Sequence, residues 1–220
     1  MARRKPKTIK VLVVDDHQLV RTGTSRLLED IDDMDIVGQS DSGEDAIKQV
    51  RELKPDVVLM DVQMPGIGGL EATRRCLRIR PSLKVIAVTI YEEEPFPSQL
   101  LQIGAVGYLT KKADVNEMAH AIRTVMSDEK YISAEIAQQL ALRPFGTSEA
   151  SPFESLTGRE MQVTLLVVSG KRVSEISETL SLSPKTVNSY RYRIFGKLDI
   201  RNDVELTKLA VKHGIMEAES

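Results

Sequence analysis

The chain has 220 residues, of which 41% are hydrophobic and 28% charged. The length favours two modest domains, and the composition fits a soluble globular protein and excludes collagen-like, low-complexity and wholly disordered proteins. The net charge of −2 excludes a polybasic coat, so any nucleic-acid binding has to come from a local patch. The single cysteine cannot form an internal disulfide, and no stretch approaches the ~20 apolar residues of a membrane span, so we expect a cytoplasmic protein without membrane contact.

Short apolar runs alternate with longer segments of helical period up to about residue 127. The runs are rich in β-branched residues and nearly all apolar, as expected of parallel strands covered on both faces. The alternation predicts an α/β domain with a doubly wound, five-stranded parallel sheet, which binds ligands beyond the carboxyl ends of its strands. The predicted strands are Val11–Val14, Ile36–Val37, Val57–Met60, Val85–Val88 and Val106–Leu109, and the predicted helices are 17–30, 43–53, 68–79, 95–104 and 114–127.

The pattern changes after residue 130. A short helix is expected at Ala134–Leu142, followed by a turn-rich stretch at 143–148 that is typical of a linker. No strand pattern follows, and a small all-α domain is predicted. Its four short helices are expected at 157–169, 173–180, 184–198 and 203–213. For the whole chain, the predicted organisation is a basic tail at 1–8, the α/β domain at 9–130, a linker at 131–152 and the all-α domain at 153–220.

Acidic residues follow two of the predicted strands. Asp15 and Asp16 come directly after the first run, and Asp61 follows the third. These strands are neighbours in the proposed sheet, so the carboxylates converge and repel one another unless a cation joins them. An all-oxygen site with open positions suits Mg²⁺, which can neutralise a phosphoryl group attacked by a carboxylate oxygen. One aspartate alone could simply cap a strand, but three at adjacent strand ends favour a metal site.

Two further strand ends carry groups that suit phosphoryl chemistry. Thr89 closes the fourth predicted strand, and Lys111 follows the fifth. A hydroxyl and an ammonium are the groups that would hold phosphoryl oxygens beside an acidic nucleophile. Each signal is weak alone, because threonine and lysine end many strands.

Four motifs between residues 9 and 127 resemble, in this order, the receiver domain of two-component response regulators. The resemblance implies a flavodoxin-like fold in which Asp61 accepts a phosphoryl group from a sensor histidine kinase. It also implies that Asp16, Asp61 and the backbone carbonyl of Gln63 ligate Mg²⁺, with Asp15 contributing through water. The motifs are Val13-Val14-Asp15-Asp16-His17, Met60-Asp61-Val62-Gln63-Met64-Pro65-Gly66, Ala87-Val88-Thr89 and Gly107-Tyr108-Leu109-Thr110-Lys111.

The same resemblance implies roles for three residues around the phosphoryl group. Thr89 would move toward it, Tyr108 would turn inward, and Lys111 would pair with a phosphoryl oxygen. Phosphorylation adds charge and acceptor oxygens at one edge of the sheet, and a bistable surface elsewhere would respond to them.

A basic stripe lies near the C-terminus. Residues 1–150 carry 20 Lys/Arg and 23 Asp/Glu, whereas residues 182–201 carry five cations and one anion. On the helix predicted at 184–198, Val187, Ile194 and Leu198 share one face, and polar residues lie opposite. Such a helix suits the DNA major groove, where side chains read base edges and Arg and Lys contact phosphates. On charge alone a solvated helix fits equally well, but the preceding helix and short turn favour a helix-turn-helix.

Residues 153–215 resemble the helix-turn-helix of LuxR-type regulators, the NarL/FixJ family. The last helix resembles the dimerisation helix of that family, although it could also pack only within its own domain. The matching positions are Leu156-Thr157-x-Arg159-Glu160, Ile176, Leu180, Ser183-x-Lys185-Thr186-Val187 and Lys197-Leu198. The match implies that Lys185, Asn188, Ser189 and Tyr192 face the groove, and that Thr186, Arg191, Arg193 and Lys197 contact the DNA backbone.

Three segments narrow the resemblance to the GacA/UvrY type of these regulators. This type pairs with a GacS/BarA-type sensor kinase and activates genes for small regulatory RNAs, and the resemblance implies the same here. The segments are Glu94-Pro95-Phe96-Pro97, Tyr131-Ile132-Ser133 with Ala137-Gln138-Gln139-Leu140, and the run from Ser183 to Arg193.

The sequence therefore predicts a DNA-binding transcription regulator that is controlled by phosphorylation of Asp61 and forms a homodimer on activation. One alternative is a constitutive DNA binder whose receiver only docks other proteins. Another is an enzyme, either a phosphotransferase or a phosphatase, that uses an aspartyl-phosphate intermediate. Phosphatases of that kind place a second aspartate two residues after the nucleophile, where this chain has Gln63. We therefore expect no enzymatic turnover of an external substrate.

Overall fold

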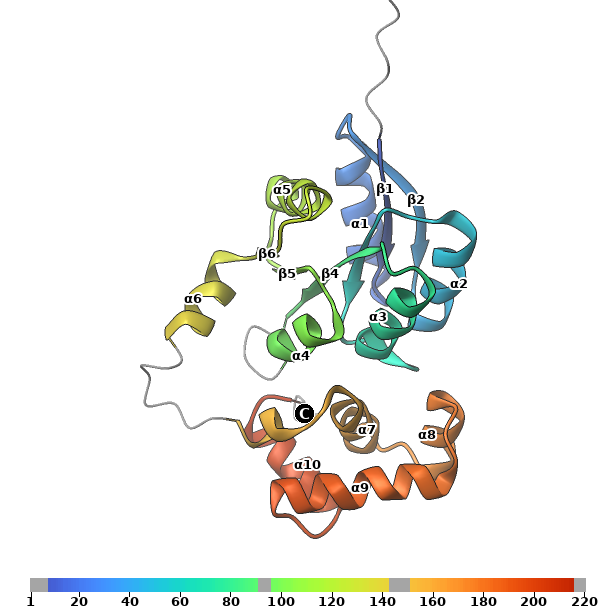
Figure 1. Cartoon of the computed structure of the whole chain (residues 1–220), viewed down its shortest axis with the longest axis vertical. Coiled ribbons are helices and arrows are strands. Elements are labelled where there is room, and N and C mark those ends of the chain that lie inside the picture. Colours follow the sequence, from blue (N-terminus) through green and yellow to red (C-terminus); the bar gives the residue numbers. More distant parts are fainter. Residues whose placement is uncertain (1–7, 91–95, 143–150, 216–220) are drawn as a thin grey trace, which may run out of the picture. The chain divides into compact units, whose positions relative to one another are not determined.

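The computed structural model describes residues 8–90, 96–142 and 151–215 (Figure 1). The chain divides into two compact units, residues 1–146 and 147–220, and each is described by itself. The predicted tail, apart from Thr8, lies outside the described residues, as do the turn-rich stretch at 143–148 and the first residue of the helix predicted at 95–104.

The first unit is a parallel sheet with helices on both faces, as predicted (Figure 1). The strand order is β2-β1-β3-β4-β5-β6, and every neighbouring pair is parallel. The strands are β1 (Ile9–Val14), β2 (Met34–Ser40), β3 (Val57–Asp61), β4 (Lys84–Thr89), β5 (Gly107–Thr110) and β6 (Tyr131–Ile132), and the helices are α1 (Gln18–Glu29), α2 (Gly43–Leu53), α3 (Gly68–Ile79), α4 (Phe96–Ile103) and α5 (Val115–Met126).

Two apolar cores explain why the strand sequences are almost wholly apolar. Successive side chains of a strand point to opposite faces of the sheet. In β1, Val11 and Val13 lie in a core with α1 and α5, whereas Leu12 and Val14 lie in a core with α2 and α3. Both sets must therefore be apolar, which removes the alternation that an exposed sheet shows.

The sheet has a sixth strand that the sequence did not predict. Residues Tyr131 and Ile132 pair in parallel with β5, and the Ser133 backbone N–H donates to the Tyr108 carbonyl at 3.0 Å. Two residues are too few to give a periodic signal. This strand begins within the predicted linker and leads into α6 (Ala134–Leu142), the short helix that was predicted there.

The second unit contains the four predicted helices and one short addition. The helices are α7 (Gly158–Val168), α8 (Val173–Leu180), α9 (Pro184–Leu198) and α10 (Asp203–Lys212), and a 3-10 helix at Pro152–Ser155 precedes them. Side chains that cap the backbone fix where two of these helices, α7 and α9, begin. The Thr157 hydroxyl accepts from the Glu160 N–H, and the Glu160 carboxylate accepts from the Thr157 N–H, which together form a capping box at the start of α7. The Ser183 side chain caps α9 directly before Pro184.

The strand order places the candidate site. The chain leaves β1 toward β2 on one side and returns past β1 to β3 on the other, so the ends of β1 and β3 form the switch point of the sheet. Ligands of such sheets bind there. Within the described residues, none of the helices has the length and apolar character that a membrane crossing needs.

Candidate functional site

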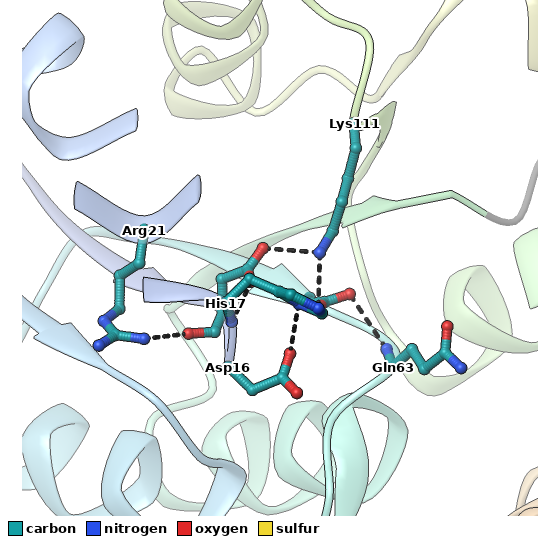
Figure 2. Close-up of polar contacts among 7 residues, drawn as sticks. Asp16, His17, Arg21, Gln63 and Lys111 are labelled. Atoms are coloured by element: carbon teal, nitrogen blue, oxygen red, sulfur yellow. Dashed lines mark hydrogen bonds and ion pairs between the residues drawn. The ribbon is translucent and has the colours of Figure 1, made fainter. Parts of the chain in front are cut away.

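Three carboxylates meet at the carboxyl edge of the sheet, where β1 and β3 end side by side (Figure 2). Asp15 and Asp16 directly follow β1, and Asp61 is the last residue of β3. Asp15 and Asp61 are buried, whereas 28% of the Asp16 side chain is exposed. With His17 they each offer a ligand atom, and these four atoms lie within 4.8 Å of one another. The structure thus brings the predicted carboxylates together.

Lys111 joins two of these carboxylates from the neighbouring end of β5 (Figure 2). Its Nζ lies 2.8 Å from Asp15 Oδ2 and 2.8 Å from Asp61 Oδ2. Burial alone would lower the pKa of Lys111, but the hydrogen bonds and charges of the two aspartates raise it above its ordinary value. Lys111 is therefore a fixed positive charge that is shared between two acidic side chains.

The surroundings of Asp61 raise the pKa of its carboxyl group. Burial raises its pKa to about 6, and the charge of Asp15 acts in the same direction, while Lys111 opposes both. Its Oδ1 also accepts the Gln63 backbone N–H at 3.1 Å, which holds the carboxylate in one orientation. At neutral pH Asp61 is a desolvated, oriented and mainly ionised carboxylate, which is suited to nucleophilic attack.

Thr89 lies in β4, which is beside β3, and Tyr108 lies in β5, the next strand beyond β4. Both side chains are fully buried. Thr89 is the last residue of β4, and its carbonyl accepts the Lys111 backbone N–H at 2.9 Å. Tyr108 lies in β5 opposite Ala87 of β4. The structure therefore places Thr89 and Lys111 at the same edge as Asp61, and Tyr108 within the sheet next to them.

The donor set fits a hard divalent cation. Asp16 Oδ1 is buried and, within the described residues, accepts no hydrogen bond, although His17 Nδ1 lies 3.0 Å away. An unpartnered buried carboxylate oxygen is costly unless a cation or water satisfies it. Carboxylate and carbonyl oxygens are the ligands that Mg²⁺ prefers. The carboxylates of Asp16 and Asp61 and the carbonyl of Gln63 could therefore hold such an ion.

Sequence reasoning missed two side chains that fix the loops around the site. Arg21 of α1 donates through Nη1 to the Asp15 carbonyl at 2.6 Å. Glu44 of α2 accepts the Ile67 backbone N–H at 3.1 Å and so holds the loop after Gln63. Neither side chain has a local signal, because each bonds to the backbone of another segment.

Sequence reasoning also missed Gly69, whose lack of a side chain allows α3 to pack close to the end of β3. A Cβ atom there would lie 1.9 Å from the Asp61 carbonyl oxygen and 2.7 Å from Val62 Cα.

Gly69→Ala is therefore expected to push α3 away from β3 and to lower the free energy of unfolding by about 1–3 kcal/mol. Urea unfolding measures the loss. Gly23→Ala is the matched control, because nothing lies within 4 Å of its new Cβ and a helix interior favours alanine. Equal stability of the two variants would contradict this.

In the second unit, α9 exposes the predicted groove-facing residues. Its apolar face is buried through Val187, Ile194 and Leu198, as predicted. On the other side 75% of Tyr192 is exposed, Lys185 is exposed, and Asn188 and Ser189 are half-buried. Within the second unit, α9 therefore carries a polar face opposite its buried apolar face.

Two of the cations predicted to contact DNA already have protein partners. Lys197 Nζ donates to Glu160 Oε2 at 2.6 Å and to the Ser155 carbonyl at 3.0 Å. An ammonium has three N–H donors, so one remains for a phosphate. Burial would raise the pKa of Glu160, but Lys197 and the Thr157 hydrogen bonds hold it below its ordinary value. Arg191 bonds to Asp203 and Asn188.

The other two predicted backbone contacts lie near the helix surface. Arg193 is exposed, and its guanidinium carbon lies 5.3 Å from the centre of the Tyr190 ring. The Thr186 hydroxyl shares a 2.8 Å hydrogen bond with the Ser183 hydroxyl at the start of α9. The contacts of all these residues with DNA stay predictions.

Two families match the two units. The response regulator receiver domain matches residues 11–123, and the luxR family of bacterial regulatory proteins matches residues 154–210. The chain belongs to the two-component response regulators with a LuxR-type helix-turn-helix, which are phosphorylation-controlled transcription regulators. This family consists of DNA-binding regulators and not of catalytic enzymes.

Comparisons with individual relatives show which response regulators the chain is similar to. The response regulator GacA of Pseudomonas protegens is 60% identical over 210 residues, which are 96% of this chain and 99% of GacA. The response regulator UvrY of Escherichia coli K12 is 53% identical over 213 residues, 96% of this chain and 98% of UvrY. A solved complex of the response regulator RcsB with DNA is 25% identical with a TM-score of 0.59, covering 92% of this chain and 97% of that chain. The predicted family, its GacA/UvrY type and the fold class are confirmed, and the constitutive alternative is not favoured.

Proposed function

We propose that Asp61 is the phosphoacceptor, and that its phosphorylation by a sensor histidine kinase strengthens DNA binding by the second unit. The observation that carries the proposal is the buried Asp61 carboxylate, held by Lys111 and the Gln63 N–H at the switch point. An Asp61 oxygen attacks the phosphorus of a kinase phosphohistidine. The O–P bond forms as the N–P bond breaks, and the electron pair of that bond stays on the imidazole, which takes up a proton.

Lys111 and Thr89 would act on the transferred group. Lys111 already lies between Asp15 and Asp61, so it can pair with a phosphoryl oxygen without a large movement. Thr89, at the end of β4, would donate its hydroxyl to another oxygen, and Tyr108 would fill the space behind it. The new charge at this edge would thereby alter the neighbouring surface.

A Mg²⁺ ion would be held by Asp16, Asp61 and the Gln63 carbonyl, with Asp15 contributing through water. When bound, the ion supplies positive charge that offsets the phosphoryl oxygens. The support is the buried Asp16 oxygen, which accepts no hydrogen bond within the described residues, together with the convergence of the three carboxylates. Residues of the chain orient the carboxylates, because the Gln63 N–H holds Asp61 and Arg21 holds the loop that contains Asp15.

The second unit would bind promoter DNA through α9, with two copies of the chain on two half-sites. We propose that the receiver extends from residue 9 through β6 (Tyr131–Ile132), that the linker follows β6 up to residue 152, and that the DNA-binding domain covers 153–220. Pairing links two moderate affinities through effective concentration, which makes binding depend steeply on phosphorylation. The RcsB–DNA complex supports DNA as the partner.

The GacA and UvrY relatives support a finer assignment. We propose a GacS/BarA-type kinase as phosphodonor and small regulatory RNA genes as targets, with action in the cytoplasm, where promoters lie. No external substrate is expected, because Gln63 occupies the position that an acid occupies in aspartyl-phosphate phosphatases.

Selection from a random duplex pool tests the function. The full chain is incubated with the pool, with and without acetyl phosphate and Mg²⁺, and bound duplexes are sequenced. The proposal expects one enriched motif, recovered more strongly with the phosphodonor. A pool that stays unenriched would contradict DNA recognition, and equal recovery without the donor would restore the constitutive alternative.

Tyr192 tests the role of α9, because 75% of this residue is exposed and it lies on the predicted groove-facing side of the helix. Tyr192→Ala is expected to weaken binding to the selected duplex by roughly 1–3 kcal/mol if the ring contacts bases. Fluorescence anisotropy titration measures this. A random duplex is the control, and an equal loss on both duplexes would make Tyr192 a DNA-backbone contact.

A further inference from the structure

The loop that carries the Gln63 carbonyl is short and is held by hydrogen bonds at its base. It covers residues 62–67, between the end of β3 and the start of α3. The Gly69 backbone N–H donates to the Val62 carbonyl at 3.0 Å, and the Gln63 N–H donates to Asp61 Oδ1 at 3.1 Å. A backbone carbonyl has no side-chain torsions of its own, so the course of this loop decides where the proposed carbonyl ligand lies.

The other end of the loop is held by a side chain of a different helix. Glu44 Oε1, in the first turn of α2, accepts the Ile67 backbone N–H at 3.1 Å. Ile67 is the residue directly before α3, and its apolar side chain provides no cap. In a capping box, the N–H of this residue bonds to a glutamate or glutamine three residues further on, where α3 has Leu70. Glu44 therefore supplies from α2 a carboxylate that α3 lacks at this position.

Close packing gives the contact between Glu44 and the loop a defined geometry. Helices α2 and α3 share one apolar core on the same face of the sheet (Figure 1). A Cβ atom on Gly66 would lie 2.6 Å from Glu44 Oε1 and 2.8 Å from Oε2, so the carboxylate lies directly against the loop backbone. A Cβ atom on Gly43 would lie 2.7 Å from Cγ1 of the buried Ile67 side chain. The start of α2 and the loop are thus packed together without space between them.

We propose that Glu44 is a positioning residue of the magnesium site, because its hold on Ile67 keeps the Gln63 carbonyl where Mg²⁺ can bind it. Glu44 would do this without contacting the ion. The inference rests on the proposed binding of Mg²⁺ by Asp16, Asp61 and Gln63. Groups that orient metal ligands from outside the ligand set are needed for full metal affinity. A loop that has lost the Glu44 contact would have to be ordered each time the ion binds.

Glu44→Ala and Glu44→Gln test the role of this hydrogen bond. The full chain is titrated with Mg²⁺ alone, and the shifts of its amide resonances give the dissociation constant. Glu44→Ala is expected to raise the dissociation constant of Mg²⁺ about tenfold. Glu44→Gln should stay within about twofold of the wild type, because its amide oxygen can still accept the Ile67 N–H. The dispersion of the same spectra shows whether each variant is folded.

Two further variants separate the hydrogen bond from its charge and from stability. Glu52→Ala is the matched control, because it removes the same charge from an exposed position in the last turn of α2 and should keep the wild-type constant. Glu44→Asp keeps the charge on a side chain that is one carbon shorter. It is expected to weaken Mg²⁺ binding as Glu44→Ala does, and it replaces Glu44→Ala in the comparison if the alanine variant is unfolded.

A dissociation constant in Glu44→Ala equal to that of the wild type would overturn the positioning role. An equal loss in Glu44→Gln and Glu44→Ala would also overturn it, because the charge and not the hydrogen bond would then be responsible. A wild-type chain whose resonances do not respond to Mg²⁺ would overturn the proposed metal site itself, which distinguishes the two failures.

Discussion

Asp61→Asn is expected to abolish covalent phosphoryl labelling from acetyl phosphate. The amide is a poor nucleophile, and in the wild type Lys111 and the Gln63 backbone N–H orient the buried Asp61 carboxylate at the switch point. Mass spectrometry of the intact chain should show one acid-labile phosphoryl adduct on the wild type and none on the variant. The folded state should persist, because asparagine has the same shape.

Asp35→Asn is the matched control for this loss. Asp35 is an exposed aspartate in β2, on the far side of β1 from Asp61, and it should keep full labelling when changed. An adduct that persists in Asp61→Asn, on Asp15 or Asp16 for example, would contradict the assignment of the phosphoacceptor.

The same substitution is expected to stabilise the metal-free chain at pH 8 by about 3 kcal/mol. Burial raises the pKa of Asp61 to about 6 in the folded chain, above its value in the unfolded chain. Between about pH 4 and pH 6 the folded state holds a proton that the unfolded state has lost. Wild-type stability therefore falls as the pH rises through this window and stays lower above it. An asparagine carries no charge and escapes this cost.

Urea unfolding in a chelating buffer from pH 4 to pH 8 measures the effect. The two proteins should have similar stability at pH 4 and diverge as the pH rises, and Asp35→Asn should follow the wild type. Added Mg²⁺ should narrow the gap, because it binds the folded wild type more tightly. Parallel curves for wild type and Asp61→Asn would show that the Asp61 charge carries no such cost.

The main elements of the fold could be predicted because their signals are local. Runs such as Val57–Met60 are apolar on both faces, and the structure places them between two helical layers. The capping box of Thr157 and Glu160 also lies within four consecutive residues. The strand at Tyr131–Ile132 could not be predicted, since its formation depends on the free edge of β5.

The candidate site could be predicted in part, for the same reason. Asp15, Asp61 and Lys111 follow strands, so a parallel sheet brings them to one edge. Arg21 bonds to a backbone carbonyl six residues earlier, Glu44 to a backbone N–H 23 residues later, and Gly69 acts through a close approach of backbones. Such contacts become visible only once the chain is folded.

The protein partners of the cations on α9 could not be predicted from the sequence either. The sequence shows that Lys197 and Arg191 are cationic, and solvent or DNA is the natural partner to expect. Glu160, which binds Lys197, lies 37 residues away along the chain, and Asp203 lies on the following helix. A cation with a protein partner contributes to the fold as well as to a binding surface.

The affinity of the selected duplex, with and without acetyl phosphate and Mg²⁺, tests the coupling between the two units most directly. Anisotropy titration of the full wild-type chain and of Asp61→Asn under both conditions gives four dissociation constants. The account predicts that the phosphodonor tightens wild-type binding by about tenfold or more and leaves Asp61→Asn unchanged. A wild-type affinity that is equal under both conditions would contradict it.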